Sequence, residues 1–456
     1  MNKSHFALWL MLLVSPLVAQ EVPSSFSLQQ AQDYAVEHAY NVRDRQLEIE
    51  KTKKLITETA SIGLPQISAS ASFNNYVDIP TQIIPNFIND ALPNPDPNAP
   101  EFIAAQFGTD YNVQGGVTLN QLIFDGSYIV ALVATRVLKE GAALDYETSV
   151  IEIRDNVAQA YYSVLVNERV QSILEDNIES LNKSLTETQA LYQSGFVEEQ
   201  DVDQLEILVS NLQNTLIYTQ ANAKISRILL NLQMGLDVER PIVLTEDVAD
   251  LVSVTIDGVS ILSEEFVLEN HIDYRALENQ QQGANLSVQN EQMQYLPKVY
   301  GFLNYAQTYQ GNDVEFWADA NSGLWFPTTV WGVNLQWDLF TSWKRVSRVQ
   351  QAKIDVAKLE VAKEQVTDGL KLQYEQAKTD YEFQLNTFNT QSRNLELAQK
   401  ILNRTQVKFQ QGVASSLDLT QAQNQYLETL TSYTRSALSL LQAKSTMQRV
   451  LGNYNL

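Results

Sequence analysis

Apolar residues recur at intervals of three and four along two long stretches that contain no proline. These stretches are residues 128–194 and 343–411, and the only glycines within them are Gly141 and Gly369. At a rise of about 1.5 Å per residue, each stretch would form a helix on the order of 100 Å long. An apolar stripe this narrow is typical of helices that pack against other helices as coiled coils. Taken alone, the two stretches favour a coiled-coil rod.

Strict alternation of apolar and polar residues predicts β-strands elsewhere in the chain. Within residues 65–76, the odd positions from 67 to 73 are apolar and the even positions from 66 to 74 are polar. Residues 113–124 and 331–339 show a similar alternation. A further strand is expected to open near residue 296. Each such strand has one apolar face and one polar face. Six of the twelve prolines fall in residues 80–100, which predicts a surface loop there without helix or ladder.

The sequence contains an internal twofold repeat. Leu64-Pro-Gln-Ile67 matches Leu296-Pro-Lys-Val299 where strands open, and Gly116-Val-Thr-Leu119 matches Gly332-Val-Asn-Leu335 in the later strands. The turns after the long helices also match, because each has a glycine followed six residues later by an aspartate. The chain is therefore two copies of helix, β-hairpin, long helix, turn and helix.

The first twenty residues have the features of a secretory signal peptide. Lys3 precedes an apolar run at residues 6–14, and small residues lead to a cleavage position near Ala19. That run is too short to span a bilayer, and no later stretch approaches eighteen apolar residues. We therefore expect an exported protein that could enter a membrane only as a closed β-barrel. The net charge of −23 argues against nucleic-acid binding, and the absence of cysteine removes disulfides and thiolate metal sites.

Four strands are too few to close a barrel, because about eight is the minimum for an outer-membrane barrel. A trimer would supply twelve strands, and the long helices would assemble in the same way. Aromatic residues that flank alternating strands are typical of a membrane-interface girdle, although an aromatic-rich soluble hairpin would show the same clustering. The tryptophans that bracket the second hairpin are Trp317, Trp325, Trp331, Trp337 and Trp343.

The repeat, the Leu-Pro strand openings, the Gly-Val-x-Leu strands and the matching turns together resemble the outer membrane efflux protein family, the TolC-like ducts. The resemblance implies a mostly α-helical homotrimer with a 12-stranded β-barrel in the outer membrane and a long periplasmic α-helical barrel. It also implies three kinds of partner: a periplasmic adaptor (membrane fusion) protein, an inner-membrane transporter and outer-membrane lipid. The implied function is passive efflux of small toxic compounds, with type I protein secretion as the alternative.

This interpretation divides the chain into a signal peptide, two repeats and an equatorial segment. The first helix, residues 27–62, has Ser25 or Ser27 placed to cap it. The expected segments, in order, are a signal peptide at 1–20, a periplasmic helix at 21–63, a transmembrane β-hairpin at 64–126 with an extracellular loop at about 79–108, a long helix pair at 127–234, an equatorial segment at 235–262, a second periplasmic helix at 263–295, a second hairpin at 296–342, and a second helix pair with the C-terminal tail at 343–456.

The turn after each long helix would lie at the periplasmic tip, where the family docks its adaptor. A glycine there allows a positive φ and close helix approach, and an exposed apolar neighbour offers a contact to a partner. A plain helix hairpin would need the same glycine. The residues that the resemblance assigns to docking are Gly195, Phe196, Val197, Gly412, Val413 and Ala414.

Asp201 and Asp418 match the position of gate aspartates in the family. Threefold symmetry would bring three copies of each into one constriction, where the negative field would favour cations. Either aspartate could instead stabilise the first turn of its helix. Two positions depart from the family pattern: a glutamine, Gln421, replaces a second aspartate, and Ala414 replaces an arginine. The full set expected at the gate is Asp201, Asp203, Gln204, Asp418 and Gln421.

Nothing in the sequence supports an enzyme, a cofactor or a metal site. His38 and His271 are the only histidines after the signal peptide, and neither belongs to a cluster with metal-ligand spacing. No phosphate-binding glycine loop or catalytic serine motif occurs. Outside the channel class, the competing hypothesis is a secreted, non-channel coiled-coil scaffold, which would leave the alternating strands and clustered tryptophans unexplained.

Overall fold

The computed structural model describes residues 24–91, 93–94, 96–257, 259–314 and 325–452. The chain forms two compact units, and each unit takes matching segments from both repeats. One, the helical unit, comprises Met1–Asp44, Thr148–Val267 and Lys371–Leu456. The other, the sheet unit, comprises Arg45–Glu147 and Leu268–Leu370. The structural division therefore cuts across the sequence repeat.

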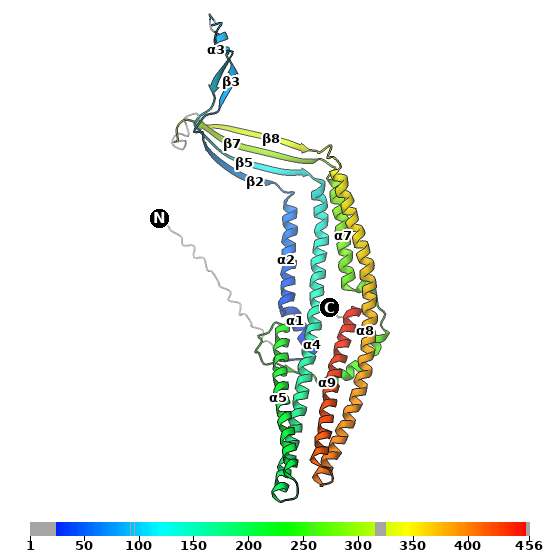
Figure 1. The fold of residues 1–456 in the computed structure, drawn as a ribbon. Coiled ribbons are helices and arrows are strands. Elements are labelled where there is room, and N and C mark those ends of the chain that lie inside the picture. The colour runs from blue at the N-terminus through cyan, green and yellow to red at the C-terminus, as the bar shows by residue number, and fades with distance from the viewer. Residues whose placement is uncertain (1–23, 92, 95, 258, 315–324, 453–456) are drawn as a thin grey trace, which may run out of the picture. The chain divides into compact units, whose positions relative to one another are not determined.

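The described elements are mostly helical (Figure 1). Their order is β1 (Ser25–Phe26), α1 (Leu28–His38), α2 (Tyr40–Ser61), β2 (Gln66–Asn75), β3 (Thr81–Pro85), α3 (Phe87–Asp90), β4 (Phe102–Gln106), β5 (Tyr111–Phe124), α4 (Gly126–Gln193), α5 (Glu199–Met234), β6 (Val243–Leu244), α6 (Val248–Asp257), the 3₁₀ turns η1 (Val259–Ser263) and η2 (Leu268–Asn270), α7 (Ile272–Met293), β7 (Lys298–Gly311), β8 (Trp325–Gln336), α8 (Lys344–Gln410) and α9 (Ser416–Leu451).

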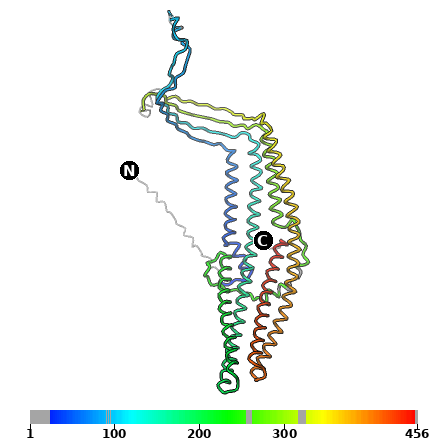
Figure 2. The backbone as a smooth tube through the Cα atoms, in the orientation of Figure 1, coloured from blue at the N-terminus to red at the C-terminus, as the bar shows by residue number. Residues whose placement is uncertain are grey.

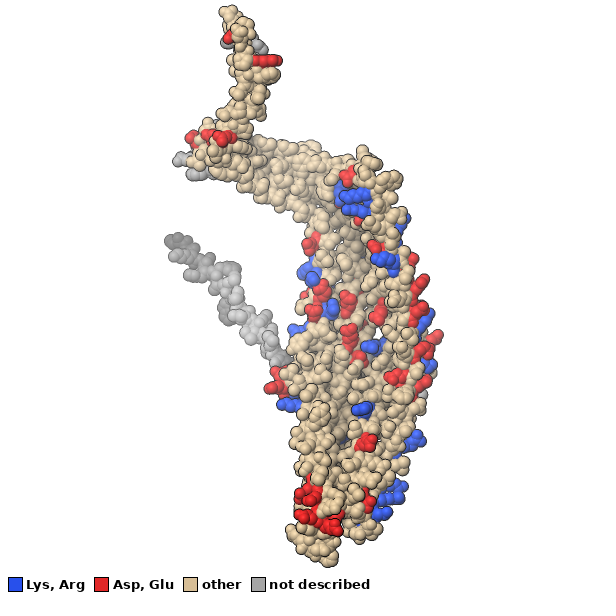
Figure 3. All heavy atoms as spheres, viewed as in Figure 1, with Lys and Arg blue, Asp and Glu red and all other residues tan. Residues whose placement is uncertain are grey.

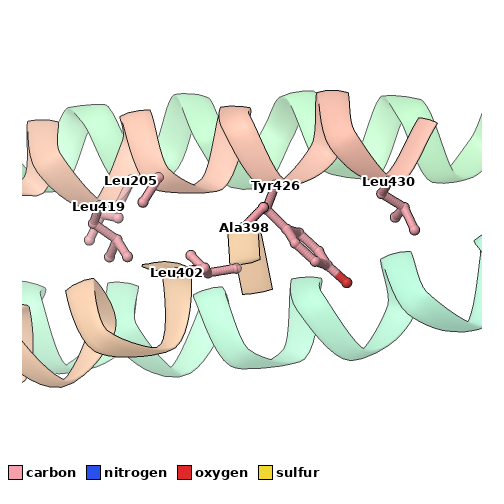
Figure 4. Close-up of a cluster of buried hydrophobic side chains, with 7 residues drawn as sticks. Leu205, Ala398, Leu402, Leu419, Tyr426 and Leu430 are labelled. Carbon is pink, nitrogen blue, oxygen red and sulfur yellow. The ribbon is translucent and has the colours of Figure 1, made fainter. Parts of the chain in front are cut away.

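Two helix hairpins, α4–α5 and α8–α9, form most of the helical unit. Their narrow apolar stripes meet in a core to which α5, α8 and α9 contribute (Figure 4). The buried residues of this core are Leu205, Ala398, Leu402, Leu419, Ala422, Tyr426 and Leu430. The two predicted coiled-coil stretches are thus long helices, and within each hairpin the stripe is used for packing. Among the described residues, no helix is both long and apolar enough to cross a membrane.

The helix expected over residues 27–62 is interrupted at one residue. Ser27 caps α1, as predicted, in a capping box with Gln30. Ala39 then adopts an extended conformation with ψ 142°, and α2 begins at the next residue. At this break the carbonyl oxygen of His38 lies against the turn at Gly235. The approach is so close that a Cβ atom added to Gly235 would lie 2.4 Å from that oxygen. Packing of this distant turn therefore ends α1, and the local sequence gave no sign of it.

The sheet unit contains a four-stranded antiparallel sheet in the order β2-β5-β7-β8 (Figure 2). Its register aligns the apolar positions across all four strands. One row runs Ile67, Leu119, Leu303 and Trp331, and it lies on an apolar face. The adjacent row lies on the other face and includes Ser68, Thr118 and Asn304. Within this row, Asn304 Nδ2 donates a hydrogen bond to Thr118 Oγ1 at 2.7 Å. The predicted alternation is therefore continuous across the sheet.

The proline-rich segment differs from the expectation of an unstructured loop. Strands β3 and β4 pair in five antiparallel positions, and α3 follows β3. The expectation was wrong because the prolines avoid the interior of the ladder. Pro85 occupies its last pair, opposite Phe102, and Pro93 and Pro100 lie in the connection between the strands.

A buried hydroxyl in the helical unit gives a test of packing. Tyr161 is fully buried and donates to the carbonyl oxygen of Phe26 at 3.0 Å. We expect Tyr161→Phe to destabilise the protein by about 0.5–1.5 kcal/mol, because the carbonyl would lose one donor and keep only the backbone N–H of Thr245, which donates to it at 3.1 Å. The measurement is the midpoint of denaturant unfolding of the detergent-solubilised protein. The matched control is Tyr40→Phe, since that side chain is 62% exposed. Equal shifts in the two variants would contradict the prediction.

Candidate functional site

The turns that end the two helix hairpins have the same backbone geometry. Gly195 has φ +78° and Gly412 has φ +70°, in the left-handed region that glycine adopts without strain. The amide after each glycine reaches back into the helix: Phe196 N donates to Leu191 O at 2.9 Å, and Val413 N donates to Lys408 O at 2.8 Å. Each long helix therefore ends in a Schellman motif.

The residues after these glycines place apolar side chains in solvent. Phe196 is 78% exposed and Val413 is 72% exposed, while Val197 and Ala414 are half-buried. In a Schellman motif the residue at this position commonly packs back onto its own helix. Here it does not, so both turns present an apolar contact.

Both aspartates expected at the gate lie in the first turn of a helix. The carboxylate of Asp201 accepts from the backbone N–H of Glu198 at 3.2 Å, and that of Asp418 accepts from Ser415 N at 2.9 Å and Ser415 Oγ at 2.8 Å. The hydrogen bonds from Ser415, first from its backbone and then from its hydroxyl, hold the pKa of Asp418 below its usual value. The capping interpretation therefore applies to both residues.

The structure brings Asp201 and Gln204 together through a serine that the sequence did not single out. The hydroxyl of Ser416, at the start of α9, donates to Asp201 Oδ1 and lies 2.8 Å from Gln204 Oε1. Ser416 is only 2% exposed, so this contact ties α9 to α5 inside the helical unit. Asp203 and Gln421 are exposed and do not take part. The two serines before α9 could have suggested a helix cap, but nothing local points to the partner of Ser416, which is 215 residues away.

The described tryptophans lie at different levels of the sheet unit. Trp325 is the first residue of β8, and Trp337 follows the last residue of β8 and donates from Nε1 to Tyr295 O at 3.0 Å. Trp331 lies midway along β8 and is 79% exposed, and Trp343 immediately precedes α8. Trp317 lies outside the described residues. Trp325 and Trp337, two of the five tryptophans expected at the membrane interface, therefore lie at opposite ends of β8.

An ion pair joins the start of β7 to the residue between β5 and α4. Lys298 Nζ lies 2.9 Å from Asp125 Oδ2, and Phe124 is paired with Val299 in the sheet. This ion pair was not among the contacts expected from the sequence, although oppositely charged residues at adjoining strand ends could have suggested it. Within the described residues, no group of three or more potential metal ligands occurs.

The sequence model of the outer membrane efflux protein family matches residues 33–236 and 265–453. The chain belongs to the outer membrane efflux protein family. It is accordingly an outer-membrane protein that extends into the periplasm. The family to which it belongs consists of efflux channels. The family predicted from the repeat and the turns is thus confirmed. No curated protein sequence matches the chain significantly.

Solved outer-membrane channels share the fold at low sequence identity. The channel CmeC of Campylobacter jejuni is 15% identical with a TM-score of 0.68, covering 93% of this chain and 85% of that one. The outer membrane protein VceC of Vibrio cholerae is 15% identical with a TM-score of 0.65, covering 93% and 96%. The open state of the MtrE channel of Neisseria gonorrhoeae is 14% identical with a TM-score of 0.65, covering 93% and 88%. The mostly helical fold of this family is therefore established.

The Asp418 capping box gives a pH prediction. Because its folded-state pKa is lowered, Asp418 stabilises the start of α9 above the ordinary aspartate pKa of about 3.9, and this contribution is lost as pH falls through the lowered value. Ser415→Ala removes one donor, so we expect the pKa of Asp418 to rise and the first turn of α9 to fray at a higher pH. The measurement is amide hydrogen exchange of that turn against pH, corrected for intrinsic rates.

The control for this pH profile is Thr429→Ala. Thr429 Oγ1 donates to Gln425 O within the middle of α9, far from the capping box. An unchanged profile in Ser415→Ala, or the same shift in Thr429→Ala, would contradict the assignment of the pKa to the box.

Proposed function

We propose that three copies of the chain form a passive exit duct. A closed 12-stranded β-barrel crosses the outer membrane, a long α-helical barrel crosses the periplasm, and the duct opens when a periplasmic adaptor and an inner-membrane transporter engage its tip. Its cargo is small toxic compounds. The observation that carries this proposal is a four-stranded sheet with one apolar face, one polar face and two unpaired edges.

The unpaired edges support assembly. Among the described strands, β2 and β8 each pair on one side only. An open edge is not tolerated in the hydrocarbon core of a membrane. The four strands are 10, 14, 14 and 12 residues long, which suits tilted strands that need about 9–11 residues to cross a bilayer. Three copies supply twelve strands, joined β8 to β2, and remove every edge.

The exposed apolar face supports contact with lipid. Ile67 is 71% exposed and Trp331 is 79% exposed, and Val333 and Leu335 on the same face are exposed as well. A soluble sheet would bury such a row against another layer. In a closed barrel this face meets the acyl chains, and the face that carries Ser68 lines the lumen.

The tip residues supply docking and gating in this duct. The exposed Phe196 and Val413 contact the adaptor, together with the glycine turns that precede them. Threefold symmetry gathers Asp201 and Asp418 near the entrance, where Gln204 and Gln421 are neighbours and Asp203 adds negative charge. Carboxylates so arranged favour cations. The capping hydrogen bonds hold both carboxylates in place, and those from Ser415 also keep the pKa of Asp418 below its usual value.

Single-channel recording in a planar bilayer tests both the duct and its gate. We expect the wild-type protein to insert and show cation-selective openings. The Asp201→Asn, Asp418→Asn double variant keeps a capping oxygen at each position but removes the charges, so its cation-over-anion permeability ratio should fall by about twofold or more. The control is Glu179→Gln, an exposed carboxylate on α4 that lies about four turns before the end of the helix.

The outcomes separate the two parts of the proposal. Openings with unchanged selectivity in the double variant would leave the duct in place and restrict both aspartates to capping. A protein that never inserts, and that washes out of membranes in carbonate, would overturn the duct and leave the secreted scaffold.

A further inference from the structure

Helices α4, α8 and α9 line a cavity within the helical unit. Its volume is about 590 Å³, and all of its lining residues belong to that one unit. Each helix contributes a buried leucine to it: Leu181 of α4, Leu402 of α8 and Leu419 of α9. Small-molecule sites in proteins usually have volumes of about 300–1,000 Å³ and largely apolar walls. The cavity therefore has the size and the apolar surface that a small organic ligand requires.

One polar side chain in this cavity lacks a hydrogen-bond partner. Gln423 of α9 is 2% exposed, and its Nε2 atom forms no hydrogen bond with any described residue. No other buried polar atom without a partner in the described part of the chain lines the cavity. A buried donor without an acceptor is unfavourable, and native proteins rarely leave one. Gln423 therefore needs an acceptor atom, and the cavity is where a ligand would supply it.

Aromatic rings from α9 lie beside the charged groups of the cavity. Tyr426 is 5% exposed and extends from α9 toward α4, and Tyr433 lies about two turns further along the helix (Figure 4). Burial raises the pKa of Tyr426, and the charges of Arg169 and Asp176 have smaller effects on it, which places both near this ring. A carboxylate and the face of an aromatic ring both attract a cation.

The charges around the cavity do not cancel. Arg169 and Asp176 of α4 and Glu396 of α8 line it with exposed side chains, and none forms an ion pair within the described residues. Gln406 Nε2 donates to Ser180 Oγ at 2.7 Å, which sets the level of α8 against α4. Arg169 lies 11 residues before Ser180, and both helices run toward their turns. Glu396 lies 10 residues before Gln406, so it is level with Arg169 and offsets its charge. Asp176 is left without a basic counterpart.

The surroundings of the cavity also favour a cation. The chain carries a net charge of −23, and acidic side chains gather at the end of the α4–α5 hairpin (Figure 3). A surface of one sign raises the local concentration of oppositely charged ligands and repels those of its own sign. An anionic ligand is therefore disfavoured, and a neutral one would gain nothing from Asp176.

We propose that this cavity binds a small organic amine that also carries a hydrogen-bond acceptor. Its ammonium group lies between the carboxylate of Asp176 and the ring of Tyr426, and its apolar frame lies against Leu402 and Leu419. Its acceptor oxygen receives a hydrogen bond from Gln423 Nε2. Water alone would satisfy Gln423 but would leave the leucines and Asp176 without a ligand. The inference goes beyond the proposed duct, because the site is formed within one copy.

Three probes that share a phenol frame and differ in charge test the proposal. They are tyramine, which is a cation, its neutral alcohol analogue tyrosol, and the anion 4-hydroxyphenylacetate. Each is titrated into the full-length protein in a non-ionic detergent, and binding is measured by ligand-observed NMR against empty micelles. We expect tyramine to bind about tenfold more tightly than either of the other two, because only its ammonium pairs with Asp176.

Two substitutions assign the binding to this cavity. Asp176→Asn should weaken tyramine by about tenfold and abolish its advantage over tyrosol. The matched control is Glu175→Gln, an exposed carboxylate on α4 that does not line the cavity. Gln423→Leu should weaken tyramine by about fivefold. It should not lower the midpoint of denaturant unfolding without the probe, since Gln423 Nε2 makes no hydrogen bond that would be lost.

Each contrary result overturns the proposal. Absence of tyramine binding would mean that the cavity holds only water. Equal affinities for the three probes, or the same loss in Glu175→Gln as in Asp176→Asn, would show that no amine site exists there. These results are independent of the conductance experiment. A protein that conducts ions but does not bind tyramine loses this inference alone, and one that binds tyramine but never inserts loses only the duct.

Discussion

Backbone hydrogen bonding at the sheet edges is the constraint on which the rest of the structure depends. A four-stranded sheet leaves the N–H and C=O groups of β2 and β8 without partners on one side. Water can satisfy them but lipid cannot. The aligned register concentrates apolar residues on one face, and no layer formed by the described residues covers that face. Both features leave the single copy incomplete, and the shared barrel that we propose would resolve them together.

The two repeats keep one framework and differ in its details. Both hairpin turns have a left-handed glycine and an aspartate that caps the following helix. Only Asp201 also accepts from Ser416, so one of two equivalent residues has become a link between the hairpins. The glycine and the aspartate that the repeats share therefore fix the backbone of both turns. The contact between Ser416 and Asp201 makes the two turns different.

Features set by local sequence were predictable, and features set by distant residues were not. The long helices, the alternating strands, the Ser27 cap and the glycine turns each follow from neighbours within one or two turns of chain. The break at Ala39 depends on the turn at Gly235, and the Ser416 contact joins residues 215 positions apart. The β3–β4 ladder could not be predicted from the number of prolines alone. Their positions decide it, because Pro85 occupies only the last pair of the ladder.

The mixing of both repeats in each unit has a consequence for biogenesis. The central pairing of β5 with β7 joins Thr118 to Asn304, 186 residues further along the chain. During export the first hairpin reaches the periplasm well before its partner strand exists there. Pairings of such long range form slowly and leave strand edges open to aggregation. The first half of the protein must therefore remain unassembled, with its apolar strand residues shielded, until the second half has been delivered.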